Sequence, residues 1–153
     1  MNIVKLESFS VIGIKVRTTN ENAQAAKDIV ALWNTFMSQN CIDKIPNKVS
    51  TAVFSIYTNY ESDYTKPYDT ILGCKVSSLD KIPEGMVGHS FKASTYKEFK
   101  AQGNLSAGIV YKKWLEIWGA DLERLYTADF EVYGDTAKDT TNAEVPIYVA
   151  VKE

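Results

Sequence analysis

The fold of this 153-residue chain is decided by one stretch, Tyr126-Thr127-Ala128-Asp129-Phe130-Glu131-Val132-Tyr133. Apolar and polar side chains alternate along it, as they do in a β-strand that buries one face and half exposes the other. Phe130 and Val132 share one face, and Asp129, Glu131 and Tyr133 share the other. The strand therefore carries carboxylates beside a phenol on the face opposite its apolar residues.

A second stretch of the same kind lies earlier in the chain. Val53-Phe54-Ser55-Ile56-Tyr57 matches the later strand at an offset of 76 residues, and Ile71 matches Ile147 at the same offset. The one chemical difference between the two strands is Ser55 against Glu131. The chain is therefore predicted to repeat one unit, over approximately residues 1–77 and 86–153. The alternative is that two strand-helix-strand-strand units resemble each other by pattern alone.

Helix and strand patterns complete the two halves. Residues 23–37 and 105–118 are predicted as helices because their apolar residues recur at helical spacing. Residues 78–85 are predicted as the linker between the halves. The other strands are predicted over residues 3–17 (or a bent pair of strands, with Gly13 as a candidate bulge), 68–77, 86–101 and 145–152.

Each half is then a β-α-β-β unit, and two such units are expected to pair their strands into one curved antiparallel sheet. The predicted fold class is α+β, with two main helices and a central ligand groove. We expect the helices to cover the face of Phe54 and Phe130. Glu131 and Tyr57 are then expected on the opposite, concave face, near the axis that relates the halves. A groove at such an interface is a usual place for a small-molecule site.

Composition excludes several classes of function. A hydrophobic fraction of 45% and a charged fraction of 24% are typical of a globular protein. The net charge of −2 provides no basic field for a nucleic-acid backbone, so no direct nucleic-acid binding is expected. The N-terminus is no signal peptide, and no apolar run approaches the roughly 20 residues of a membrane span. We therefore expect a cytoplasmic protein with no membrane contact.

Residues that bind metals or perform nucleophilic catalysis are few. Cys41 and Cys74 fit no metal-ligand spacing and are interpreted as reduced thiols. His89 is the only histidine, which argues against a zinc site and against a Ser-His-Asp triad. No metal and no cofactor are predicted. Aromatic residues are the enriched class, with nine Tyr, three Trp and six Phe.

Several segments together resemble a known family. They are Ile45-Pro46-Asn47-Lys48-Val49, Tyr57-Thr58-Asn59-Tyr60-Glu61-Ser62-Asp63-Tyr64, Leu72-Gly73-Cys74-Lys75-Val76, Ile82-Pro83-Glu84-Gly85-Met86, Trp118 with Leu122, the stretch from Tyr126 to Tyr133, and Asn142-Ala143-Glu144-Val145-Pro146-Ile147-Tyr148. This pattern resembles the GyrI-like, AraC-type effector-binding domain, which also occurs at the C-terminus of multidrug-sensing regulators. The resemblance implies a single domain over residues 1–153 with the duplicated β-α-β-β fold. Many relatives carry a helix-turn-helix DNA-binding domain before it; here the pattern begins at Met1, so we expect a stand-alone member, similar to integron-cassette drug-binding proteins.

The resemblance also implies a pocket for small hydrophobic, often aromatic and cationic compounds. The key acid of the family's Phe-Glu-x-Tyr strand corresponds to Glu131. A poorly hydrated cation loses little on leaving water and gains roughly 0.5–2 kcal/mol from each ring face beside that acid. The alternative for Glu131 is a rim glutamate bonded to a tyrosine or lysine, and for each aromatic residue it is plain packing. The predicted ligand-binding residues are Glu131, Tyr133, Tyr57, Tyr148, Trp118, Tyr126 and Tyr60, the last in a loop with Tyr64 that could act as a lid.

Three hypotheses about function follow, and the first is a binding module for hydrophobic cations with Glu131 as its charge selector. The second is a hydrolase of strained electrophiles that uses the same glutamate as general acid or base. The third is a protein-interaction module of the gyrase-inhibitor kind. The expected partners are small molecules and, in addition, a regulator or gyrase; the sequence leaves both a monomer and a homodimer open.

Overall fold

The computed structural model describes residues 2–153 of the chain. Its two long helices are α1 (Gln24–Ser38) and α3 (Ile109–Gly119), and α2 (Cys41–Lys44) is a single turn. No helix within residues 2–153 is both long enough and apolar enough to cross a membrane. The strands are β1 (Asn2–Leu6), β2 (Phe9–Thr18), β3 (Val53–Thr58), β4 (Tyr68–Val76), β5 (Val87–Phe91), β6 (Ser94–Gly103), β7 (Ala128–Tyr133) and β8 (Ala143–Ala150).

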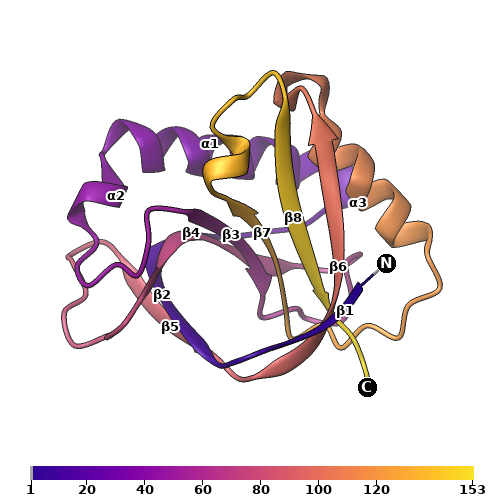
Figure 1. Cartoon of the computed structure of the whole chain (residues 1–153), viewed down its shortest axis with the longest axis horizontal. Helices are drawn as coiled ribbons and strands as arrows, with labels where there is room; N and C mark the ends of the chain where they lie inside the picture. Colours follow the sequence, from indigo (N-terminus) through magenta and orange to yellow (C-terminus); the bar gives the residue numbers. More distant parts are fainter. Residues whose placement is uncertain (1) are drawn as a thin grey trace.

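All eight strands join one antiparallel sheet in the order β1-β6-β8-β7-β3-β4-β2-β5 (Figure 1). β3 and β7, the two strands that match at an offset of 76 residues, lie side by side at its centre. The predicted α+β class, with a curved antiparallel sheet and two main helices, is confirmed. The origin of the two halves by duplication stays a prediction.

The register of the central strands decides which side chains share a face. Residues directly opposite each other in an antiparallel pair point to the same side of the sheet. Ser55 pairs with Glu131 across β3 and β7, so their side chains share one face. Phe130 pairs with Ile56 on one side and with Tyr148 on the other, so these three share the opposite face.

Both long helices cover the Glu131 face, and the expectation that they cover Phe54 and Phe130 is wrong. Leu32 and Phe36 of α1 pack in one core cluster with residues of β2 and β4. Trp114 of α3 packs in another cluster with residues of β8. The core cluster that contains Phe130 includes no residue from either helix.

The Phe130 face is covered by the sheet itself. The ring centroid of Phe130 lies 5.3 Å from that of Phe9 in β2, 5.4 Å from that of Tyr96 in β6 and 5.0 Å from that of Tyr148 in β8. Because β2 and β6 flank opposite sides of the central strands, these contacts require the sheet to curl away from the helices, as Figure 1 shows. The curl buries the apolar face and leaves the Glu131 face for α1 and α3.

Gly13 marks a close approach of two strands, and its prediction as a bulge is wrong. It pairs with Gly73 in an unbroken register between β2 and β4. A Cβ atom on Gly13 would lie 1.9 Å from the carbonyl oxygen of Leu72, and one on Gly73 would lie 2.4 Å from that of Ile12. The glycine pair therefore lets two neighbouring backbones pass each other where side chains would collide.

Candidate functional site

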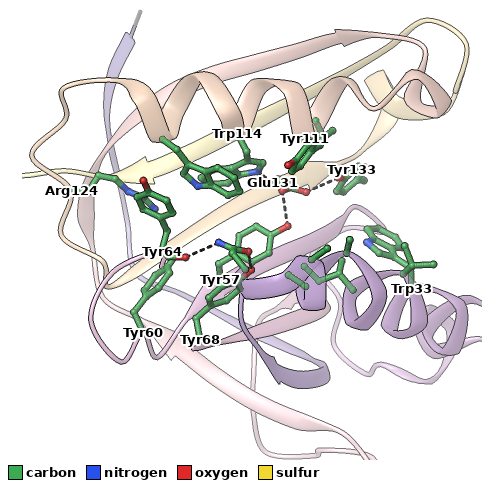
Figure 2. Close-up of a pocket in the computed structure, with 18 residues that line it drawn as sticks. Trp33, Tyr57, Tyr60, Tyr64, Tyr68, Tyr111, Trp114, Arg124, Glu131 and Tyr133 are labelled. Carbon is green, nitrogen blue, oxygen red and sulfur yellow. Dashed lines mark hydrogen bonds between the residues drawn. The ribbon is translucent and has the colours of Figure 1, made fainter. Parts of the chain in front are cut away.

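A cavity of about 440 Å³ lies between α1 and α3, above the Glu131 face of β3 and β7 (Figure 2). This volume suits a small organic molecule. Among residues 2–153, the only charged side chains that line it are Glu131 and Arg124. Half of the residues that line it are aromatic, namely Trp33, Tyr57, Tyr60, Tyr64, Tyr68, Tyr111, Trp114, Trp118 and Tyr133.

Glu131 is buried at the floor of this cavity, with 2% of its surface exposed. Its Oε2 atom accepts hydrogen bonds from the Tyr57 hydroxyl at 2.7 Å and from Trp114 Nε1 at 2.6 Å. Its Oε1 atom accepts one from the Tyr133 hydroxyl at 2.6 Å. No basic side chain of residues 2–153 forms an ion pair with it. The carboxylate is therefore held by three neutral donors, and its charge has no counter-ion in the part of the chain that the structure describes.

The pKa of the Glu131 carboxyl is raised from its ordinary value. Burial is the main cause, because it disfavours the charged form. The hydrogen bonds from Tyr133, Tyr57 and Trp114 act in the opposite direction and lower the pKa, but they do not cancel the effect of burial. An opposite charge placed beside this carboxylate would also lower its pKa, as the three hydrogen bonds do, and would stabilise the ionised form.

The two tyrosines that hold Glu131 keep their protons. The pKa values of the Tyr57 and Tyr133 hydroxyls are raised well above their ordinary value, first by burial and then by the nearby charge of Glu131. Ser55 Oγ donates in turn to the Tyr57 hydroxyl oxygen at 3.2 Å. Both phenols are therefore fixed as donors towards the carboxylate.

A second buried carboxylate, Asp129, lies one pleat away and does have a counter-ion. Its Oδ2 atom accepts from Arg124 Nη2 at 2.7 Å and from the Tyr60 hydroxyl at 2.6 Å. Its Oδ1 atom accepts from the backbone N–H of Ala150 at 2.8 Å. The Arg124 and Asp129 side chains are 5% and 0% exposed. This pair is charge-neutral, so among the described residues Glu131 alone supplies the net charge of the pocket.

Arg124 is surrounded by aromatic rings. Its Cζ atom lies over the ring of Tyr126 at 4.3 Å from the centroid, and 5.9 Å and 6.0 Å from the ring centroids of Trp114 and Tyr64. Tyr126 has a backbone φ of 55°, a left-handed conformation that an aromatic residue rarely adopts. Tyr126 lies in the irregular segment before β7 and contacts the guanidinium group in this conformation.

The loop before β4 closes one end of the cavity. The ring of Tyr64 stacks on that of Trp118, at 5.2 Å between centroids and 7° between planes. Asn20 fastens this loop, because its Nδ2 donates to the Tyr64 carbonyl oxygen at 2.7 Å and its Oδ1 accepts from the Tyr68 hydroxyl at 2.6 Å. The loop therefore brings Tyr60 and Tyr64 to the wall of the cavity.

The structure brings together most of the site residues expected from the sequence, and two lie elsewhere. Glu131, Tyr133, Tyr57, Trp118 and Tyr60 all line the cavity. The placement of the other two differs from the expectation. Tyr148 pairs with Phe130 and stacks on it, so it lies on the opposite face of the sheet. Tyr126 contacts Arg124 from beneath and is not among the lining residues.

Three important residues of the cavity were not predicted. Trp114 was not among the predicted ligand-binding residues, and its spacing of four residues from Trp118 was the only sign of a shared face. Trp33 lines the cavity from α1, with its ring 5.0 Å from that of Tyr133. Arg124 lies in an irregular segment with no periodicity, so no sequence signal placed it. Among residues 2–153 no three His, Cys, Asp or Glu side chains gather as a metal site would require.

Comparison with known proteins gives matches over nearly the whole chain. Residues 2–151 match the family described as integron-associated effector binding protein, Cass2. An integron cassette protein from the mobile metagenome of Vibrio cholerae is 34% identical, with a TM-score of 0.75 over 99% of this chain and 95% of that chain. YobU of Bacillus subtilis (strain 168), a candidate transcriptional regulator, is 28% identical over 156 residues, which cover 99% of this chain and 98% of YobU. SAV2435, in a structure bound to tetraphenylphosphonium, shares the fold at 21% identity, with a TM-score of 0.79 over 99% of this chain and 93% of that chain.

Proposed function

The chain belongs to the family of integron-associated effector binding proteins, and we propose that it binds lipophilic aromatic cations in the cavity between α1 and α3. In this proposal Glu131 selects for positive charge, and the surrounding rings supply apolar contact area. The bound molecule is the effector. The protein either presents the bound state to a partner or removes the molecule from solution by sequestering it.

One observation carries the proposal: Glu131 is a buried carboxylate with no counter-ion among residues 2–153. An unpaired buried charge is costly, and proteins retain such groups where they perform a task. A ligand cation in the cavity would provide the missing opposite charge. Because no other described residue brings an uncompensated charge to the cavity, we expect one positive charge per bound ligand.

The hydrogen bonds of Glu131 indicate which kind of cation fits. A carboxylate has about four acceptor positions, and Tyr57, Tyr133 and Trp114 already occupy three of them. A primary ammonium or guanidinium group has at least three N–H donors, and the carboxylate has only about one acceptor position left for them. A phosphonium, quaternary ammonium or delocalised aromatic cation needs charge and ring faces rather than acceptors. Its weak hydration also lowers the cost of leaving water.

A protein of the same fold supports this choice. The structure of SAV2435 holds tetraphenylphosphonium, a cation without hydrogen-bond donors. At 21% identity the two proteins share a fold, but their individual contacts with a ligand cannot be equated. The argument for this chain therefore depends on its own carboxylate and rings.

The test compares two ligands of the same shape and different charge. N-methylacridinium is a fluorescent aromatic cation, and methylanthracene is its neutral counterpart. In Glu131→Gln, we expect affinity for the cation to fall by about 10-fold or more, since a partly desolvated charge pair is worth over about 1.4 kcal/mol. Affinity for methylanthracene should change by less than about 2-fold, because the rings remain.

The matched control is Glu116→Gln, which removes a carboxylate of α3 whose side chain is 68% exposed. It should change the affinity for either ligand by less than about 2-fold, since solvent and salt screen an exposed charge. Asp129 does not serve as a charge control because it is paired with Arg124 inside the protein. Equal losses in Glu131→Gln and Glu116→Gln, or no loss in either, would overturn the proposal and favour a surface for a protein partner instead.

A further inference from the structure

Arg124 has buried donor atoms that no described residue accepts from. Its side chain is 5% exposed and lines the cavity. Nη2 donates to Asp129 Oδ2, but Nε and Nη1 are buried without a hydrogen-bond partner among residues 2–153. A buried donor left without an acceptor costs about 1–3 kcal/mol, and more when the group is charged.

The neighbouring groups do not supply the missing acceptors. Both oxygens of Asp129 are engaged, by Arg124 itself, the Tyr60 hydroxyl and the Ala150 N–H. The rings of Tyr126, Tyr64 and Trp114 stabilise the positive charge, but a ring face offers no lone pair to an N–H group. The two donors therefore remain unsatisfied, and a ligand in the cavity can use them once a side chain that covers them moves aside.

Trp114 connects these donors with the acid at the floor. Its indole Nε1 donates to Glu131, and its ring centroid lies 5.9 Å from Arg124 Cζ. Figure 2 shows Glu131 and Arg124 on either side of this indole, with Tyr64 beside Arg124. A flat ligand lying along Trp114 would present one part to the carboxylate and another to the guanidinium group.

We propose that Arg124 is a second polar anchor of the pocket, and that its Nε and Nη1 groups donate hydrogen bonds to a carbonyl oxygen on the bound aromatic cation. This inference rests on the proposed cation site and adds the class of ligand: cations that carry an ester, amide or ketone. A neutral acceptor is favoured over a carboxylate because Asp129 already balances the charge of Arg124. A second anion there would be repelled by Asp129.

We expect the Tyr64 ring to move aside when this contact forms. Its ring lies beside the guanidinium group and stacks on Trp118, on the loop that closes the cavity. The Tyr64 hydroxyl makes no hydrogen bond to any of residues 2–153, and its loop is fastened through the backbone carbonyl of Tyr64 to Asn20. The ring can therefore turn aside while the loop stays attached.

The test uses two dyes that differ by one ester group. Tetramethylrosamine and tetramethylrhodamine methyl ester share the same cationic ring system, and only the second carries a carbonyl. We expect the wild-type protein to bind the ester dye about 10-fold more tightly, the effect of one hydrogen bond to a charged donor. The carbonyl stretching band of the bound ester should shift to lower frequency.

The matched variant is Arg124→Lys, which keeps a positive charge for Asp129 and removes the Nε and Nη1 donors. In this variant the two dyes should bind with affinities within about 2-fold of each other, and the carbonyl shift should disappear. Equal affinities in the wild-type protein, or a preference that survives in Arg124→Lys, would overturn the proposal. If the variant fails to fold, an unshifted carbonyl band in the wild-type complex overturns it.

The two proposals fail in distinguishable ways. Glu131→Gln should lower the affinity for both dyes by the same factor and leave the ratio of the two affinities unchanged, because both dyes carry the same charge. If neither dye binds the wild-type protein, the cation site is refuted and the role of Arg124 with it. If both bind equally well, the cation site stands and the role of Arg124 is refuted.

Discussion

Ser55 and Glu131 face each other directly across the central pair of strands β3 and β7. They are also the two residues that match at an offset of 76 in the sequence. Two glutamates at these positions would bring two carboxylates together in a buried site, where both cannot ionise easily. With serine opposite, Ser55 supports Tyr57 and Tyr57 supports Glu131, so this cross-strand pair carries one carboxylate and not two.

Replacing Glu131 should affect stability in a pH-dependent way. Burial raises the pKa of this carboxyl, so its ionised form is less favourable in the folded state than in the unfolded one. The contribution of the Glu131 carboxyl to stability is therefore fully present below its pKa in the unfolded state, about 4.3. It is lost as the pH rises through its pKa in the folded state. Glu131→Gln should match the wild-type protein in acid and be as stable or more stable in neutral solution, as urea denaturation at several pH values would measure.

The glutamine can keep the hydrogen bonds that surround it. Its amide oxygen can accept from Tyr57 and Trp114, and its NH₂ group can donate to the Tyr133 hydroxyl oxygen. A variant less stable than the wild-type protein by more than about 1 kcal/mol in neutral solution would contradict this expectation, because the bonds to the carboxylate would then outweigh its desolvation.

Cation binding should weaken as the solution becomes more acidic. A cation is attracted by the ionised form of Glu131, so affinity falls as pH drops through the pKa that this group has in the empty pocket. Trp114→Phe removes a hydrogen bond that lowers the pKa of Glu131. The midpoint of the loss of affinity should then move up by about one pH unit, as dye titrations across the pH range would show.

The control for this shift is Trp118→Phe. Trp118 lies on the same helix and lines the same cavity, but it does not donate to Glu131. It should lower affinity by loss of ring contact and leave the midpoint unchanged. Equal shifts in the two variants would show that the indole hydrogen bond does not govern the ionisation of Glu131.

Phe130→Ala should destabilise the protein strongly. Phe130 is 2% exposed and lies among the rings of Phe9, Tyr96 and Tyr148, so its removal leaves a cavity in the core. The expected loss is about 3–5 kcal/mol in the free energy of unfolding, measured by chemical denaturation.

Phe54→Ala is the comparison, because Phe54 stacks on Phe130 but is only partly buried. Its loss should be smaller, about 1–3 kcal/mol. The affinity of the folded fraction for a cation should stay unchanged in both variants, since this face lies opposite the cavity. A loss below about 1 kcal/mol for Phe130→Ala would contradict the burial of this face.

Asp129→Asn should cost more stability than Asp69→Asn, although both remove one carboxylate charge. Asp129 is paired with Arg124 at 5% side-chain exposure, so its neutralisation leaves a buried cation and about 3–5 kcal/mol is lost. Asp69 is paired with Arg17 and Lys15, whose side chains are 50% and 48% exposed. Water can therefore solvate these two cations when the Asp69 charge is removed. About 1 kcal/mol or less is expected there. Equal losses in urea denaturation would mean that Arg124 does not depend on Asp129.

Local patterns predicted the elements of this fold well. The alternation around Phe130 and Phe54 predicted β7 and β3, and helical spacing predicted α1 and α3 within a few residues. Such periodicities follow from backbone geometry alone, so they can be read without knowing the tertiary structure. The resemblance to the effector-binding family is confirmed by the match over residues 2–151.

The same patterns did not reveal what covers each face of the sheet. Alternation shows that Phe130 and Glu131 point to opposite sides, but it does not show which side receives the helices. That choice depends on the curl that brings Phe9 and Tyr96 together over Phe130 from opposite flanks of the sheet. Tyr148 was misplaced for the same reason, since its face depends on its register with Phe130.

The sequence by itself determined the order of strands and helices, the single acid opposite Ser55 and the supply of aromatic residues. The tertiary structure alone decided which of those residues surround the acid. Trp114 reaches Glu131 because α3 packs over β7 and β8, and Arg124 reaches the cavity because Asp129 holds it there. Contacts of this kind depend on how the helices pack and how the sheet curves. Packing and curvature leave no periodic signal in the sequence of a single chain.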